Sequence, residues 1–283
     1  MKILLATDGS ESAKAAVDCL IRFPFPENSE FTLLTVIDRD IFKGESVTGI
    51  SDEQQVALQE TEKLVHDEAQ ELLAREAARL RKAGLSESTE LRIGHPAEEI
   101  VRVAEQLDAD CIIVGSHGMS GIKRFLLGSV SDHVLQYAPC SVLIVKKPGL
   151  IPDESGKTTV TTAADEHAGP LRMLLAYDDS TPARQAVEFC ASLPLQERAE
   201  VTALTVMPLV TLYRQDIRQR LSWLWLEKKK QALAALETVS KELGKATSQV
   251  EGQLREAADV SDEILHAAIE YNSDLIVLGH KGK

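Results

Sequence analysis

Residues 115 to 129 combine glycines, serines and one histidine in a pattern that suits the binding of an anion. They follow a short apolar run, and the spacing G-x2-G-x9-G-S places Gly115, Gly118, Gly128 and Ser129 at its fixed positions. Glycine lets the backbone approach a bulky anion and leaves amide N–H groups free to donate to it. In several α/β folds, a strand that ends in such a loop before a helix holds phosphate. The pattern therefore predicts a phosphate-binding loop.

The chain repeats itself. Residues 2–10 return 170 positions later as 172–180, residues 33–37 return at the same offset as 203–207, and residues 110–118 match 274–282 at an offset of 164. Three blocks in the same order indicate a tandem duplication of one α/β domain of about 145 residues. We predict domains at 1–147 and 171–283. The stretch 148–170 between them is rich in Pro, Gly, Thr and acidic residues and reads as a linker.

The second copy is the shorter of the two. It stops one residue after Gly282, whereas the first copy continues well beyond the matching Gly118. That continuation holds the third glycine, the serine, a helix and a strand. We expect the second copy to lack them and to leave an apolar edge beside Leu275–Leu278 that another chain must cover. A genuine short form and a removed tail both remain open.

Apolar runs alternate with helical periods along each copy. In the first copy, strands are expected at Ile3–Thr7, Glu30–Ile37, Thr89–Ile93, Cys111–Val114 and Ser141–Val145. In the second, they are expected at Met173–Tyr177 and Glu200–Met207. Strands that alternate with helices predict a parallel, doubly wound sheet in each copy.

Two helix signals accompany these strands. Ser10 and Ser180 stand where a helix N-cap belongs. A long helix is expected from about Asp52 to Lys82, with one buried stripe made of Leu58, Val65, Leu72 and Leu73.

Asp8 and Gly115 stand at the tips of the first and fourth strands of the first copy. In doubly wound sheets, ligands bind beyond the carboxyl ends of the strands, where the strand order reverses. If the two strands are neighbours, the acid and the phosphate loop face one crevice. That arrangement suits a nucleotide.

Composition narrows the class of protein. A net charge of −13 and a pI near 5.1 argue against general electrostatic binding to nucleic acid or to an anionic membrane. We find no apolar stretch long enough to span a bilayer and no signal peptide. The four cysteines lie scattered, with Cys19 and Cys190 at nearly equivalent core positions, so we expect a reduced, cytoplasmic protein. Neither a G-x4-G-K-[ST] loop nor a metal-ligand spacing occurs.

Together, these residues resemble the universal stress protein family. The resemblance rests on Asp8 after the apolar run 3–7, on Val36 near the end of the second strand, and on the complete glycine loop, and it extends to both copies. It implies tandem flavodoxin-like (HUP-type) five-stranded sheets, the second without its last strand. It also implies pairing through the last strand, either as a homodimer or between the two copies. In members with the complete loop it implies bound ATP, with Mg²⁺.

The resemblance also implies roles for individual residues. Asp8 would contact the ribose or a phosphate-bound Mg²⁺, and Ala6, Thr7 and Val36 would line the adenine slot. The residues around the phosphates would be Gly115, His117, Gly118, Gly128, Ser129, Val130 and Ser131. The second copy has Asp179 where the first has Gly9. Because a carboxylate near phosphates is unfavourable, we do not expect that copy to bind ATP.

Several alternatives stay open. Asp8 also suits a helix cap, His117 suits phosphate contact better than general base catalysis, and Lys123 and Arg124 suit either a γ-phosphate or solvent. Ser120 and Ser129 are conceivable phospho-acceptors, although hydroxyl or backbone donors to phosphate suit the loop better. The leading hypothesis is an ATP-binding stress or regulatory protein that signals through conformation or partners. The alternatives are a slow ATPase or autokinase that uses the same pocket, and a nucleotide-free dimerising scaffold.

Overall fold

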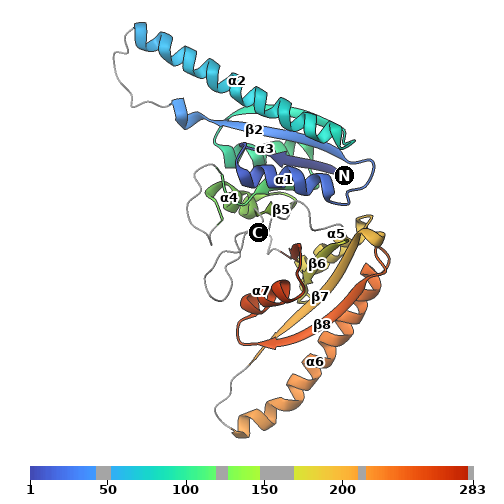
Figure 1. Cartoon of the computed structure of the whole chain (residues 1–283). Helices are drawn as coiled ribbons and strands as arrows, with labels where there is room; N and C mark the ends of the chain where they lie inside the picture. Colours follow the sequence, from blue (N-terminus) through green and yellow to red (C-terminus); the bar gives the residue numbers. More distant parts are fainter. Residues whose placement is uncertain (43–51, 119–126, 147–168, 210–214, 280–283) are drawn as a thin grey trace. The chain divides into compact units, whose positions relative to one another are not determined.

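The computed structural model describes residues 1–42, 52–118, 127–146, 169–209 and 215–279 (Figure 1). The chain divides into two compact units, Met1–Glu166 and His167–Lys283, hereafter the first and second units. Most of the predicted linker 148–170 lies outside the described residues, and the predicted domain boundaries stay a prediction.

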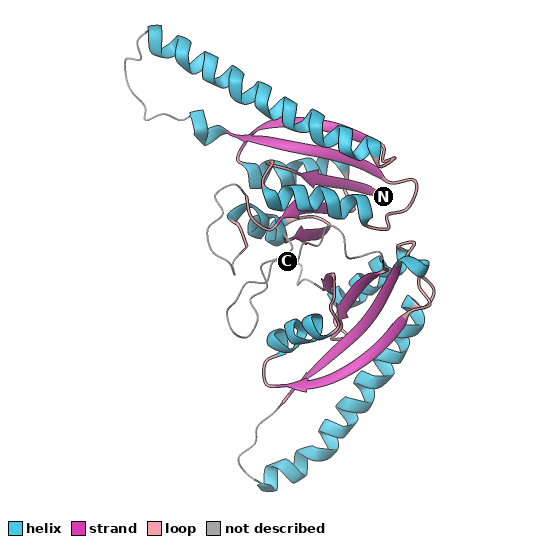
Figure 2. Ribbon diagram, in the orientation of Figure 1, coloured by secondary structure: helices cyan, strands magenta, loops and turns pink. Residues whose placement is uncertain are grey.

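The first unit alternates strands and helices, as Figure 2 shows by colour. Its elements are β1 (Lys2–Ala6), α1 (Glu11–Arg22), β2 (Glu30–Asp38), a 3-10 turn (Arg39–Phe42), α2 (Asp52–Lys82), β3 (Glu87–Gly94), α3 (Pro96–Leu107), β4 (Cys111–Gly115), α4 (Ser129–Tyr137) and β5 (Ser141–Val145).

The five strands form one parallel sheet in the order β3-β2-β1-β4-β5. β1 and β4 are therefore neighbours, with Ile3 opposite Cys111 and Leu5 opposite Ile113. The strand order reverses between them, and the carboxyl ends of the strands at such a reversal are where α/β sheets bind ligands. The predicted doubly wound sheet is confirmed.

Apolar side chains cover both faces of this sheet, as a parallel sheet requires. One core joins α1 and α2 to the strands through residues such as Leu20, Leu73 and Leu80. The other joins α3 and α4 to the opposite face through Ile100, Val103 and Val134. The two layers fix the strand ends from both sides.

The predicted buried stripe on α2 is wrong in its first half. Leu73 is buried, but Leu58 is exposed, together with every residue from 55 to 64. The helix has the predicted length and extends past the sheet, so residues 55–64 lie beyond the layer that buries the rest of the helix (Figure 1). Periodicity showed the helix but not where the sheet ends.

The second unit repeats this order with four strands in its described residues. Its elements are β6 (Leu171–Ala176), α5 (Thr181–Ser192), a 3-10 turn (Gln196–Arg198), β7 (Ala199–Pro208), α6 (Gln215–Leu243), β8 (Val250–Ala257), α7 (Val260–Glu270) and β9 (Leu275–Leu278). The strands are parallel in the order β8-β7-β6-β9. The smaller second sheet agrees with the expectation from the sequence.

Among the described helices, none combines the length and the apolar character that crossing a bilayer requires.

Candidate functional site

The loop after β1 is held by hydrogen bonds from β2. The N–H of Thr7 donates to the carbonyl of Leu34 at 2.9 Å, and the hydroxyl of Thr35 donates to the carbonyl of Thr7 at 3.0 Å. Both bonds extend the β1–β2 contact one residue beyond the strand. They place Asp8 directly at the strand tip.

Asp8 and Ser10 organise the start of α1. The N–H of Ser10 donates to Asp8 Oδ1 at 3.0 Å, and Ser10 Oγ accepts from the N–H of Ala13 at 3.2 Å. Ser10 is thus the N-cap, as predicted. Asp8 Oδ1 thus stabilises the turn through its hydrogen bond with Ser10, and the other carboxylate oxygen, Oδ2, lies toward the loop after β4.

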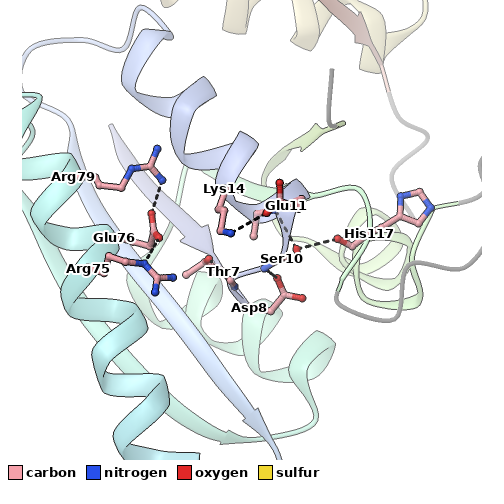
Figure 3. A network of polar contacts seen from close by, with 11 residues as sticks. Thr7, Asp8, Ser10, Glu11, Lys14, Arg75, Glu76, Arg79 and His117 are labelled. Atoms are coloured by element: carbon pink, nitrogen blue, oxygen red, sulfur yellow. Dashed lines mark hydrogen bonds and ion pairs between the residues drawn. The ribbon is translucent and has the colours of Figure 1, made fainter. Parts of the chain in front are cut away.

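The loop after β4 meets the loop after β1. The hydroxyl of Ser10 donates to the carbonyl of His117 at 3.2 Å, a contact that Figure 3 shows. A Cβ atom added to Gly118 would lie 2.8 Å from Asp8 Oδ2. A side chain at position 118 would therefore clash with the Asp8 carboxylate unless that side chain moved. The predicted acid and the predicted glycine loop face each other.

Gly115 has a structural reason of its own. A Cβ atom there would lie 2.7 Å from the carbonyl carbon of Ser12 and 2.8 Å from the nitrogen of Ala13. These are backbone atoms in the first turn of α1, which cannot move aside without shifting the helix. Gly115 thus allows β4 to end against α1.

The start of α4 closes the third side of the site. The N–H of Gly128 donates to the carbonyl of Ser116 at 2.8 Å, and Ser131 Oγ lies 3.0 Å from the same carbonyl. Gly128 is the N-cap residue, and it carries no side chain that could cap this helix. The positive end of the helix dipole, with the N–H groups of its first turn, is available to an anion.

His117 lies differently from the other loop residues. Its Nδ1 is 3.1 Å from Ser116 Oγ, and its ring points away from Asp8 and Ser10 (Figure 3). In the described part of the chain, its buried Nε2 atom has no hydrogen-bond partner. The carbonyl of His117 therefore faces the loop after β1, whereas its imidazole does not.

The three residues expected around adenine lie at the ends of β1 and β2. Ala6 and Thr7 are buried, and Val36 is half-buried against the core that α3 and α4 cover. The remaining predicted residues differ in exposure. Val130 packs on that same core, Ser131 is buried, and Gly118 and Ser129 are exposed. Ser120, Lys123 and Arg124 lie outside the described residues.

Sequence reasoning missed two residues that hold the site together. The Thr35 hydroxyl donates to the carbonyl of Thr7, and the carbonyl of Ser116 accepts hydrogen bonds from the N–H of Gly128 and the hydroxyl of Ser131. Thr35 left a signal, because the repeated segment contains Thr205 at the same offset, where its hydroxyl donates to the carbonyl of Tyr177 at 2.8 Å. Ser116 left none, since it acts through its backbone.

In the second unit, side chains around the loop after β6 form hydrogen bonds with one another. Asp179 stands at φ +62° and accepts from the Tyr177 hydroxyl at 2.8 Å and from Arg184 Nη2 at 3.0 Å. Hydrogen bonds from Tyr177 and Arg184 lower the pKa of Asp179. Its counterpart in the first unit is Gly9, at φ +76°, which carries no side chain to make such bonds.

Three comparisons place the chain among known proteins. A universal stress protein of Methanocaldococcus jannaschii is 35% identical over 147 residues, which cover 52% of this chain and 82% of the relative. A crystal structure of a universal stress protein from Archaeoglobus fulgidus shares the fold over 97% of this chain and 83% of its own, at 22% identity and a TM-score of 0.57. A family structure from Arabidopsis thaliana with AMP bound covers 55% of this chain and 98% of its own, at 18% identity and a TM-score of 0.36.

The sequence model of the universal stress protein family matches residues 1–146 and again residues 171–283. Most of the chain is covered by these two matches, which coincide with the two sheets. The chain belongs to the universal stress protein family and carries two of its domains in tandem.

Proposed function

We propose that the first unit binds ATP, together with Mg²⁺, between the loops after β1 and β4 and the start of α4. The observation that carries this proposal is the close approach of the Gly118 backbone to the Asp8 carboxylate, where a Cβ atom on Gly118 would lie only 2.8 Å from Oδ2. An acidic side chain next to a glycine of the following loop, at the reversal of strand order, suits a sugar–phosphate ligand. The family and the complete glycine loop agree with this ligand class.

Each part of the site would take one part of the nucleotide. Adenine would lie against Ala6, Thr7 and Val36, which lie at the ends of β1 and β2 and are buried or half-buried. Asp8 would accept from the ribose hydroxyls or hold Mg²⁺ that the phosphates also bind. The phosphates would lie at the uncapped start of α4, where backbone N–H groups from Ser129 onward donate to them.

Two side chains would act through the backbone rather than directly. The Ser131 hydroxyl is directed to the carbonyls of Ser116 and Gly128. The His117 ring points away from Asp8. Among the described residues, neither of these two side chains is directed at Asp8, and this favours binding over turnover. ATP would therefore act as a ligand that favours one conformation or one partner.

A matched pair of substitutions tests the proposal. Asp8 and Asp178 each accept from a serine N–H two residues on, at 3.0 Å in both cases. Calorimetric titration of the full chain with Mg-ATP should show a Kd at least about tenfold weaker in Asp8→Asn, because a charged contact is lost. Asp178→Asn should leave the Kd unchanged, since it alters the same turn in the other unit. Equal effects of the two substitutions, or none from Asp8→Asn, would overturn the proposal.

A further inference from the structure

A buried carboxylate lies at the carboxyl end of β3, at the same edge of the sheet as Asp8. Glu99, in the first turn of α3, is 6% exposed. A Cβ atom added to Gly94, the last residue of β3, would lie 2.7 Å from Glu99 Oε1. Helical side chains lean toward the helix N-terminus, which directs this one to the strand end. Because Gly94 has no side chain, the carboxylate fits directly against the backbone there.

The Glu99 carboxylate has little compensation for its burial. Its Oε1 pairs with Arg102 Nη1 at 2.9 Å, and no second side chain in the described part of the chain pairs with it. Arg102 is itself half exposed, whereas the buried Glu76 of α2 pairs with two arginines. Burying an ionised carboxylate is costly unless charges and hydrogen bonds compensate it. A ligand that donates a hydrogen bond to Glu99 would add to this compensation.

The second unit arranges the corresponding corner differently. Ala257 ends β8 where Gly94 ends β3, and Glu263 takes the place of Glu99 in the helix that follows. Glu263 pairs with Arg255 Nη1, on β8 itself, at 2.9 Å, and its side chain is 21% exposed. A carboxylate held against a bare strand end is therefore a feature of the first unit, the one that we propose binds the nucleotide.

The strand register shows which part of the ligand would meet Glu99. Gly94 pairs with Asp38 of β2, two residues beyond Val36. Because side chains alternate along a strand, these three positions face the same side of the sheet, the side that α3 covers. A strand spacing of about 4.8 Å and a rise of about 3.3 Å per residue place Gly94 about 8 Å from Val36. A base that lies against Val36 would therefore extend one edge toward Glu99.

A carboxylate at that edge distinguishes between purine bases. Adenine carries a 6-amino group, which donates hydrogen bonds, where guanine carries an oxygen, which accepts them. An ionised carboxylate only accepts. We propose that Glu99 accepts a hydrogen bond from the 6-amino group of adenine and so makes the first unit favour adenine nucleotides. This inference rests on the proposed function, because it takes the base to lie against Val36.

The test combines a change in the nucleotide with a change at position 99. The full chain is titrated by calorimetry with Mg-ATP and with the analogue in which hydrogen replaces the 6-amino group. The wild type should bind Mg-ATP at least about tenfold more tightly than the analogue, because the analogue lacks a hydrogen bond to a charged group. In Glu99→Met, which removes the carboxylate, this ratio should fall below about threefold.

Two further variants sharpen the comparison. Glu99→Gln keeps an amide oxygen that accepts hydrogen bonds but has no charge, so its ratio should lie between those of the wild type and Glu99→Met. Glu263→Met makes the matched change in the second unit and should keep the wild-type ratio.

The ratio separates a contact with the base from a structural role of Glu99. Altered packing alone would weaken both nucleotides equally, so an unchanged ratio in Glu99→Met would overturn the inference and leave the ATP site in place. Equal affinity of the wild type for the two nucleotides would overturn it in the same way. A wild type that binds neither nucleotide would overturn the proposed function, and this inference with it.

Discussion

The loops after β1 and β6 are built on the same frame. In both, an aspartate accepts from a serine N–H at 3.0 Å, and that serine caps the following helix. In both, a threonine of the next strand donates to the carbonyl of the residue before the aspartate. The frame of the strand tip is thus kept through the duplication.

The difference begins one residue later. In the loop after β1 this position is Gly9, which has no side chain. In the loop after β6 it is Asp179, which accepts hydrogen bonds from Tyr177 and Arg184. Lys14, the counterpart of Arg184, pairs instead with Glu11. The comparison teaches that this corner of the fold can carry a glycine or a hydrogen-bonded network of its own side chains, with the surrounding frame unchanged.

A second difference lies under the sheet. Glu76, on α2, is 2% exposed and pairs with Arg75 at 3.1 Å and Arg79 at 2.6 Å, and Arg79 also pairs with Asp18. Two buried leucines of α2 flank Glu76, namely Leu73 and Leu80. On α6, Leu236 and Leu243 flank Val239 at the same spacing, so Val239 is the counterpart of Glu76, and it is 4% exposed. The same buried site holds a carboxylate in one unit and an alkyl group in the other.

The largest effect should come from exchanging these two residues. Val239→Glu buries a carboxylate in the second unit, where Glu242 stands in place of Arg79. Because the new carboxylate lacks the arginine that pairs with Glu76, we expect the second unit to lose about 3 kcal/mol or more of unfolding free energy. Glu76→Val should cost the first unit less than about 1 kcal/mol, because Arg79 keeps Asp18 and Arg75 is largely exposed. Urea unfolding of each variant measures both values. Equal losses of unfolding free energy in the two variants would contradict this prediction and would show that the sites at Glu76 and Val239 are not packed equivalently.

The next effect concerns the ligand. Gly118→Asp places a second carboxylate beside Asp8, and we expect Mg-ATP to bind at least about 100-fold more weakly, or about 2.7 kcal/mol. Gly169→Asp adds the same charge where no atom lies within 4 Å and is the matched control. Unchanged affinity in Gly118→Asp would contradict the proposed site. ATP hydrolysis by the wild type in excess of this variant would favour the ATPase alternative.

Where the units agree, equal effects are expected. A Cβ atom on Gly115 would lie 2.7 Å from the carbonyl carbon of Ser12, and one on Gly279 would lie 2.5 Å from that of Pro182. Alanine at either position should therefore destabilise its own unit by about 1–3 kcal/mol. Thermal unfolding followed by hydrogen exchange assigns the loss to a unit. A tolerated Gly279→Ala would show that this close approach matters only beside the ligand.

The smallest effect should be a pH dependence confined to the second unit. The pKa of Asp179 is lowered from its ordinary value of 3.8 in the folded chain. Its ionised form therefore stabilises the folded chain at a pH above 3.8, and this stabilisation is lost as the pH falls below that value. Asp179→Asn should lower the unfolding midpoint of the second unit slightly at neutral pH and not at all in acid. Because the side chains are exposed, the difference should be small. A difference that persists in acid would assign the effect to the backbone.

Much of the fold could be predicted from the sequence, because the repeat and the alternation of apolar runs depend on local pattern. β5 matches its expected bounds, and Ser10 and Ser180 cap their helices as expected. The exposed start of α2 could not be predicted, since the length of a helix does not reveal where the neighbouring sheet ends. The approach of Asp8 to Gly118 followed only from the assumption that β1 and β4 pair.

The site was less predictable than the fold. The glycine pattern could not distinguish an anion contact from the close packing of Gly115 on α1, because both need the same residue. The direction of the His117 ring and the Tyr177–Asp179–Arg184 network depend on rotamers and on contacts between strands. No spacing along the chain encodes these.

The number of ATP molecules bound per chain tests the central claim most directly. Calorimetric titration of the full chain with Mg-ATP, after removal of any nucleotide carried through purification, should give one site per chain. That result would assign the ligand to one unit, and Asp8→Asn against Asp178→Asn would show which. Two equivalent sites would contradict the contrast between Gly9 and Asp179, and no binding at millimolar Mg-ATP would contradict the nucleotide site itself.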